Sequence, residues 1–258
     1  MKFNVHGGHN RHVPGIISYL DEVTEDRKIS KELQKLLAAE GHIVHDCTDD
    51  SARTQNGNLN NIVKKCNKKD VNLNVSVHLN GCKKVKKDGK VKGVEVWVSS
   101  MSSKAVPYAK RVCSELAKLG FTNRGVKGCK ENNRSLAVIR RTKDPAMLIE
   151  VCFADDEDDI LRYKKLGYKT VTKAIAEGIL NRKISSKTKA ASKHFKIKTK
   201  QPLVIWSSPT SGATKRCKAD KGDIYTITKV AYKGKMPYGK LLSGVGWIKI
   251  HTKYVDRM

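Results

Sequence analysis

The chain has 258 residues, 39% of them hydrophobic and 30% charged, which is enough apolar material for two domains with buried cores. No run of about 18 apolar residues is present, which excludes a transmembrane helix. The first residues, Met-Lys-Phe-Asn-Val-His-Gly-Gly, lack the apolar stretch of a secretory signal peptide, so we expect a protein made in the cytoplasm without one.

The formal net charge of +27 predicts attraction to a polyanion, which could be a nucleic acid, an anionic membrane or an anionic cell wall. The seven cysteines are odd in number and none shows C-x-x-C spacing. They therefore indicate neither a disulfide framework nor a cysteine zinc site, and we expect thiols in a reducing compartment.

Residues 1–182 alternate between strand and helix patterns. Short apolar or alternating runs predict strands at Lys2–His6, His42–Asp46, Leu73–Leu79, Val94–Val98 and Ala146–Phe153. Apolar residues at helical spacing predict helices at Glu25–Glu40, Asn60–Cys66, Val106–Leu119 and Leu166–Leu180. This order predicts an α/β domain with an open, mostly parallel, twisted sheet and helices on both faces.

Residues 183–258 have a different character, with 18 Lys and Arg against 3 Asp and Glu. Residues 183–199 are mostly polar and basic, and we interpret them as a linker. Beyond them the period changes to two, and short strands are predicted at Leu203–Trp206, Asp223–Ala231 and Gly246–His251. About sixty residues of this kind, from 200 to 258, predict a small all-β barrel.

Candidate ligands for a metal follow or begin predicted elements of the first domain. His9 follows the first strand, Glu22 precedes the first long helix, and His78 ends the strand Leu73–Leu79. Ligands distant in sequence can meet at the carboxyl edge of a parallel sheet, and two imidazoles with one carboxylate suit catalytic zinc. On spacing alone, His6 and His12 compete with His9. Asp21 and Glu25 compete with Glu22, because acidic residues also favour a helix N-terminus.

Glu150 lies inside the apolar run Met147–Val151. Burying a carboxylate is costly unless it is paired, protonated or close to a metal. From the residues alone, a catalytic glutamate and a glutamate paired with a structural cation are equally good interpretations.

Five stretches of residues 1–181, in order, carry a resemblance to a known family. They are Gly8–His9, Glu22 opening a helix with Ile29 and Leu33, Ser76–Asn80, Asn123–Val126 and Pro145–Phe153. These stretches resemble the zinc N-acetylmuramoyl-L-alanine amidases of the amidase-3 type, as found in clostridial phage endolysins. The chain departs from the family at His6-Gly7-Gly8-His9, where the family often has Gly-His-Gly-Gly, so a register in which His6 binds zinc stays open. Asp26, and Asp155 with Asp156, are further departures.

The resemblance implies one Zn2+ held by His9, Glu22 and His78, with Glu150 as the catalytic carboxylate. It implies hydrolysis of the amide between N-acetylmuramic acid and L-alanine of peptidoglycan. Asn80 and Arg124 stand beside matched motifs and either position substrate or serve as a turn residue and a surface cation.

Residues 200–258 resemble a bacterial SH3-like wall-binding domain, through Leu203–Pro209, Gly222–Tyr225 and Gly246–Ile250. Four aromatic residues of this segment either form a binding platform or fill the core: Trp206, Tyr225, Tyr238 and Trp247. The implied partner is the peptidoglycan of an anionic Gram-positive cell wall. If the protein is an endolysin, we expect it to reach this wall after release from the cytoplasm through a phage holin. Two other functions remain as alternatives, a basic nucleic-acid-binding protein with a small β-barrel and a non-catalytic wall-binding protein.

Overall fold

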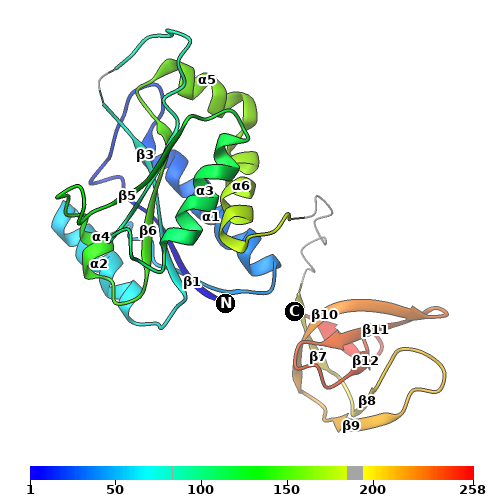
Figure 1. Cartoon of the computed structure of the whole chain (residues 1–258). Coiled ribbons are helices and arrows are strands. Elements are labelled where there is room, and N and C mark those ends of the chain that lie inside the picture. The colour runs from blue at the N-terminus through cyan, green and yellow to red at the C-terminus, as the bar shows by residue number, and fades with distance from the viewer. Residues whose placement is uncertain (83, 185–193) are drawn as a thin grey trace. The chain divides into compact units, whose positions relative to one another are not determined.

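The computed structural model describes residues 1–82, 84–184 and 194–258. The chain divides into two compact units, Met1–Ser185 and Ser186–Met258 (Figure 1). Residues 185–193 of the predicted linker lie outside the described residues. Among the described residues, none of the helices combines the length and the apolar character that crossing a membrane requires.

The first unit is built on a six-stranded sheet with the order β2-β1-β3-β6-β4-β5. The strands are β1 (Lys2–Gly7), β2 (Ile43–Asp46), β3 (Leu73–Asn80), β4 (Val94–Val98), β5 (Asn123–Gly128) and β6 (Ala146–Phe153). Strands β2, β1, β3 and β6 are parallel. Strand β4 is antiparallel to β6, and β5 is parallel to β4. The sheet is therefore mostly parallel, as predicted.

The reversal of β4 follows from the connection that precedes it. A strand can return parallel to its predecessor only through a crossover, usually a helix. The described part of the segment between β3 and β4 contains no helix and is rich in lysine and glycine. The chain therefore turns back at the edge where β3 ends, and β4 runs in the opposite direction.

Helices cover both faces of this sheet (Figure 1). One face carries α1 (Glu22–Ala39), α3 (Val106–Ala117), α5 (Glu157–Leu166) and α6 (Tyr168–Leu180). The other carries α2 (Gln55–Asn67) and α4 (Ala137–Arg141). The predicted helices are all present with shifted ends, and α1 starts earlier than predicted because the carboxylate of Asp21 accepts a hydrogen bond from Thr24 N as its N-cap.

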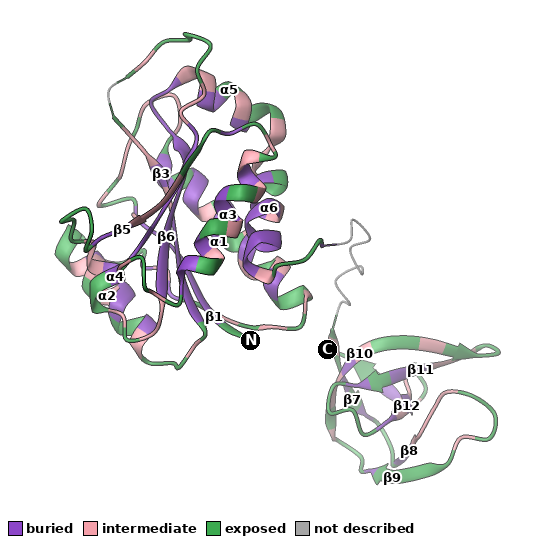
Figure 2. Ribbon diagram, in the orientation of Figure 1, coloured by how far each residue is buried: buried purple, intermediate pink, exposed green. Residues whose placement is uncertain are grey.

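The two faces of the sheet differ because side chains alternate along each strand. Val75, Val77, Met147 and Ile149 point to the first face and pack in the main core with α1, α3 and α6. The second face carries mostly polar residues, together with a smaller apolar cluster under α2 and α4 that includes Trp97. The rows of this face are Asn4–Asn74, His6–Ser76–Leu148–Trp97 and His78–Glu150–Glu95. Figure 2 shows how completely these strands are buried.

The second unit is an all-β sheet of seven strands with the order β13-β7-β10-β11-β12-β8-β9. Its strands are β7 (Phe195–Thr199), β8 (Leu203–Trp206), β9 (Lys215–Ala219), β10 (Ile224–Lys233), β11 (Met236–Leu241), β12 (Trp247–Lys249) and β13 (Val255–Arg257). Ile197, Ile205, Ile227 and Ile248 are among the residues of its core.

Strand β7 occupies residues that the sequence analysis assigned to the linker, so that the linker prediction extends too far. The alternation Phe195-Lys196-Ile197-Lys198-Thr199 buries Ile197 and Thr199 while both lysines stay exposed. The high lysine content hid this strand, because basic residues are rare in strands yet are tolerated on an exposed face.

Candidate metal centre

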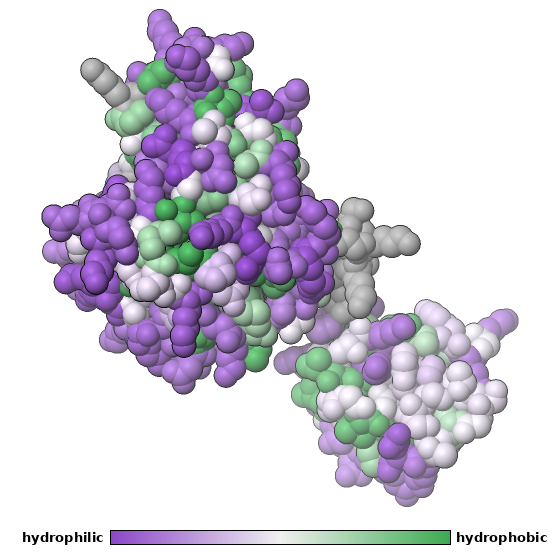
Figure 3. Space-filling model, viewed as in Figure 1, coloured by the Kyte–Doolittle hydropathy of each residue, from purple (hydrophilic) through white to green (hydrophobic). Residues whose placement is uncertain are grey.

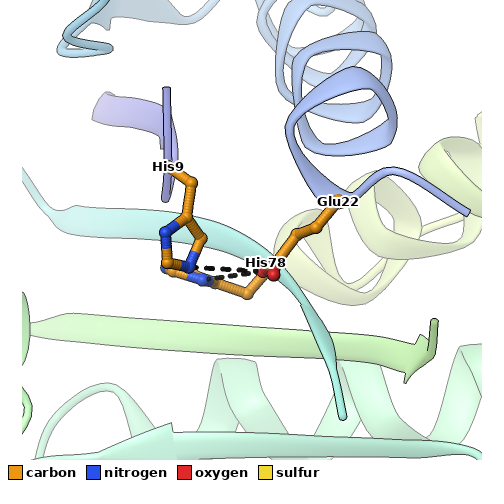
Figure 4. A group of neighbouring side chains, drawn as sticks. All are labelled: His9, Glu22 and His78. Carbon is orange, nitrogen blue, oxygen red and sulfur yellow. Dashed lines mark hydrogen bonds and ion pairs between the residues drawn. The ribbon is translucent and has the colours of Figure 1, made fainter. Parts of the chain in front are cut away.

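Three side chains from separate elements meet above the polar face of the sheet (Figure 4). His9 lies in the loop after β1, Glu22 is the first residue of α1, and His78 is on β3. The Oε1 atom of Glu22 lies 3.2 Å from His78 Nδ1 and 3.6 Å from His9 Nε2. One ligand atom from each residue can be chosen so that all three lie within 4.8 Å of one another.

Two glycines leave the space that these side chains occupy. A Cβ atom at Gly8 would lie 1.8 Å from the His78 ring, and one at Gly15 would lie 2.0 Å from Glu22 Oε2. The Gly8 amide also donates to Val77 O, at 3.0 Å, which joins the loop to β3. A side chain at either position would displace a candidate ligand.

Backbone amides hold the Glu22 carboxylate in place. Ile16 N donates to Oε2 at 2.9 Å, and Leu79 N donates to Oε1 at 3.1 Å. Burial opposes ionisation, but the contact with His78 and the positive field of both histidines hold the pKa of Glu22 below its ordinary value. The carboxylate is therefore ionised, as a metal ligand must be.

Asp26 and Arg27 fix the loop that carries His9. The buried Asp26 Oδ2 accepts from Gly8 N at 3.0 Å and from His9 N at 3.3 Å. Its other oxygen pairs with Arg27 Nη1 at 2.7 Å, and Arg27 also donates to His9 O. Burial raises the pKa of Asp26 to about 7 despite the neighbouring guanidinium. Asp26 thus lies behind the candidate ligands and fixes the backbone of the loop that carries His9.

The residues that compete with these three on spacing have other surroundings. His6 is buried on β1, where its Nδ1 contacts Gly7 O at 3.1 Å, and burial lowers its pKa to about 4. His12 is exposed.

The acidic competitors of Glu22 also have other partners. Asp21 caps α1, and Glu25 pairs with Lys28 and accepts from Tyr163 Oη at 2.8 Å. Within the described residues, the group that could hold a metal contains His9 and not His6.

Glu150 stands opposite His78 in the register of β3 and β6. Its side chain is almost fully buried, and its Oε2 atom has no hydrogen-bond partner among the described residues. Burial raises the pKa of Glu150 to about 7, although the positive field of His78 acts in the opposite direction. A cavity of about 330 Å³ lies over these residues, lined by Gly8, His9, Asn58, His78, Arg134 and Glu150 among others.

Glu95, which was not predicted from the sequence as a site residue, faces Glu150 across β4 and β6. Its buried carboxylate accepts from Arg124 Nε at 2.8 Å, pairs with Lys127 Nζ at 2.9 Å, and accepts from Trp97 Nε1 at 3.0 Å. A glutamate inside Val-Glu-Val-Trp-Val was the signal that could have revealed it. Glu95 is thus the paired carboxylate and Glu150 the unpaired one.

Neither Asn80 nor Arg124 is among the residues that line the cavity. Arg124 is tied to Glu95, and Asn80 Oδ1 accepts from Gly81 N at 2.9 Å in the turn after β3. Both therefore serve local structure here, which agrees with the simpler of the two interpretations of each residue.

The residues fit a bound zinc ion. Two imidazoles and one ionised carboxylate converge, glycines leave room for them, and Glu150, whose buried Oε2 atom has no hydrogen-bond partner among the described residues, is one of the residues that line the same cavity. His9, Glu22 and His78 would hold the ion and leave it open to water or substrate.

Residues 5–181 match the sequence profile of the N-acetylmuramoyl-L-alanine amidase family, amidase-3 type. The endolysin of Bacillus phage SPP1 is 30% identical over 244 residues, which cover 88% of this chain and 87% of that protein. An uncharacterized protein of Clostridium perfringens is 34% identical over 201 residues, covering 78% of this chain and 58% of the relative. A second protein from that species is 33% identical and covered to 54%. The chain thus spans little more than half the length of these two clostridial relatives.

Among solved structures, the catalytic domain of the CD27L endolysin, described as targeting Clostridia difficile, is similar with a TM-score of 0.62. It is 29% identical, and the similarity covers 72% of this chain and 99% of that domain. The CwlD amidase from Clostridioides difficile, solved with the GerS lipoprotein, shares the fold with a TM-score of 0.60 and 21% identity over 70% of this chain and 96% of that chain. From its sequence profile, its fold and its relatives, the chain belongs to the N-acetylmuramoyl-L-alanine amidase family.

Proposed function

We propose that the protein is a zinc-dependent peptidoglycan amidase that hydrolyses the amide between N-acetylmuramic acid and L-alanine. One observation carries the proposal: His9, Glu22 and His78 place their ligand atoms within 4.8 Å of one another in a cavity that also contains Glu150. The alternative of a basic nucleic-acid-binding protein is not favoured, because residues 5–181 match an amidase family.

His9, Glu22 and His78 would hold the ion. When bound, zinc would supply a Lewis acid for the amide carbonyl and lower the pKa of a water molecule toward about 7. The Ile16 and Leu79 amides keep the Glu22 carboxylate oriented, and Asp26 keeps the backbone of His9 in place. Such supporting hydrogen bonds tune the ligands of metal sites.

Glu150 would act as general base and then as general acid. It would accept a proton from the attacking water and return it to the nitrogen of the leaving L-alanine. A carboxyl whose pKa lies near the working pH suits both transfers, and burial raises the pKa of Glu150 to about 7. Glu95 cannot replace it, because Arg124, Lys127 and Trp97 already occupy its oxygens.

The second unit would bind the cell wall as an SH3-like domain. In support, it is all-β, basic and built around its own core. Trp206 and Trp247 pair across β8 and β12 and are half-buried, so they can offer ring faces to a ligand. Tyr238 is buried and belongs to the interior. The face of the first unit seen in Figure 3 is largely hydrophilic. The net charge of +27 suits an anionic wall as partner.

We propose the cell wall as the place of action, as in an endolysin that is released through a phage holin. The similarity to the SPP1 endolysin along most of both chains supports this role.

The test is digestion of purified Gram-positive peptidoglycan, followed by identification of the new ends by mass spectrometry. We expect new N-terminal L-alanine and intact glycan strands. A chelator should abolish the reaction and added zinc should restore it. Cleavage at another bond, or activity that persists after complete removal of metal, would contradict the proposal.

A further inference from the structure

A second cavity, of about 380 Å³, lies next to the cavity of the metal centre. Its lining includes Cys129, Lys130, Asn133, Ile139 and Arg140. The two cavities share one wall, made of the consecutive residues 134–136, whose side chains are those of arginine, serine and leucine. The two cavities therefore adjoin each other along these three residues.

The loop that forms the second cavity is held by backbone hydrogen bonds. Cys129 N donates to Val98 O at 2.8 Å and Lys130 N donates to Ser99 O at 3.0 Å, which continues the pairing of β4 with β5. Arg134 N then donates to Cys129 O at 2.9 Å and closes the loop. Asn133 has a positive φ of 47°, a left-handed conformation that asparagine adopts more readily than most other residues and that lets the chain turn here.

Three cations line the second cavity, namely Lys130, Arg134 and Arg140, and no acidic residue is among its lining residues. None of the three forms an ion pair with another described residue. The nearby Glu131 instead accepts from Met101 N at 3.0 Å. The Arg134 guanidinium lies 4.5 Å from the centre of the Trp97 ring, which restricts its movement. The cavity therefore presents three cations that have no ion-pair partner among the described residues, while at longer range Lys130 acts on Glu131 and Arg134 acts on Glu150.

We propose that this second cavity is the subsite for the peptide side of the substrate and that it binds a free carboxylate of the stem peptide. The inference rests on the proposed function. In the substrate of such an amidase, the lactyl carboxyl of muramic acid is consumed in the scissile amide, so the adjoining glycan offers no carboxylate. The residue after L-alanine is a glutamate that carries one. An extended residue spans about 3.5 Å, so this carboxylate lies within a few residues' length of the reacting bond.

Arg134 and Lys130 then determine specificity. Arg134 borders both cavities and can bind a carboxylate through two parallel N–H···O bonds, whereas Lys130 adds charge on the far side. Substrates in which the second residue is amidated lack the negative charge that these residues bind. The wild-type enzyme should discriminate against them.

The experiment compares two synthetic muropeptides that differ only in a free carboxylate or an amide on the second stem residue. We expect the zinc-loaded, full-length protein to show a kcat/KM about tenfold higher on the free carboxylate. Arg134→Gln and Lys130→Gln should each reduce that preference, mainly by lowering kcat/KM on the carboxylate substrate. Arg141→Gln removes the same charge from a residue that does not line the second cavity, and should retain the preference.

The outcomes separate this inference from the proposed function. If wild type hydrolyses neither muropeptide, the proposed amidase function fails. If it hydrolyses both equally well, or if Arg134→Gln and Lys130→Gln reduce both rates by the same factor, the amidase function stands and the carboxylate subsite is wrong. A loss seen only on walls that carry phosphate polymers, with the muropeptide preference unchanged, would assign the cavity to those polymers and also overturn the inference.

Discussion

The two faces of the sheet in the first unit are built by the same strands but carry different chemistry. On one face, Val77 and Ile149 pack side by side in a continuous apolar core with α1, α3 and α6. On the other, their neighbours His78 and Glu150 stand side by side under a cavity. Adjacent residues of one strand thus serve opposite purposes.

The difference shows how a small domain keeps a costly site. A buried carboxylate without a partner, as at Glu150 Oε2, destabilises the folded state. The apolar face of the sheet offsets this cost, because large side chains of the strands and of the helices that cover them are buried against each other. Substitutions of neighbouring residues should therefore separate activity from stability.

The largest expected effect is on catalysis. Glu150→Gln keeps the shape of the side chain but removes its capacity to accept a proton, so we expect kcat to fall by about 10²- to 10⁴-fold. Bound zinc, measured by elemental analysis, should stay at one ion per chain. Turnover near the native rate would show that another group is the base.

The matched change on the other face is Ile149→Ala. Ile149 is fully buried, and we expect its truncation to lower the free energy of unfolding by about 2–5 kcal/mol. Calorimetry on the full chain should show a lower transition for the first unit, while the activity per folded molecule changes little at low temperature. A large loss of specific activity without loss of stability would contradict the assignment of stability to one face of the sheet and of activity to the other.

Gly15→Ala tests how far the polar site extends into the loop above the sheet. The new Cβ would lie 2.0 Å from Glu22 Oε2 and 2.7 Å from His9 Cδ2. We expect zinc affinity to fall roughly 10- to 100-fold, measured by competition with a chelating dye. The control is Gly57→Ala, where the nearest atom is Thr54 Oγ1 of the α2 cap, and it should bind zinc normally. Equal zinc affinities of the two variants would mean that the loop can shift to accommodate the added methyl group without displacing Glu22.

The smallest effect concerns stability and its dependence on pH. The pKa of Glu150 is raised from 4.5 to about 7, so ionisation is less favourable in the folded than in the unfolded state. The resulting destabilisation is absent below pH 4.5, grows between pH 4.5 and 7, and is complete above pH 7. In protein from which a chelator has removed the metal, Glu150→Gln should then raise the free energy of unfolding by about 1–2 kcal/mol at pH 8.

This gain should vanish at pH 4, where the carboxyl of Glu150 is protonated in both states. Chemical unfolding of both proteins at the two pH values gives the comparison. If Glu150→Gln is no more stable at pH 8, then Glu150 has a partner that neutralises its charge.

Much of the fold was predictable because the signals are local. Val94–Val98 and Ala146–Phe153 form strands with the predicted ends, since β-branched and apolar residues fill both sides of a buried strand. Strand β5 and helices α4 and α5 were not predicted. β5 reads Asn-Arg-Gly-Val-Lys-Gly and is only partly buried, and α5 begins with three acidic residues, so neither shows an apolar period.

The four candidate site residues were recognised from position and family resemblance, but their surroundings were not. The residues near Glu150 in the sequence do not predict that Glu95 lies beside it, because the two residues meet only where β4 pairs with β6. The cation at Arg134 likewise lies far from Trp97 in sequence, and only the closed loop after β5 brings them within 4.5 Å.

The sequence by itself determined the alternation of strands and helices, the polar character of the positions at His78 and Glu150, and the strongly basic second unit. Those properties depend on residue type and spacing along the chain. Only the tertiary structure decided that His9, and not His6, joins His78 beside Glu22, which carboxylate stays without a partner, and where a second cavity adjoins the first. These depend on contacts between residues distant in sequence, and the packing of the whole domain determines such contacts.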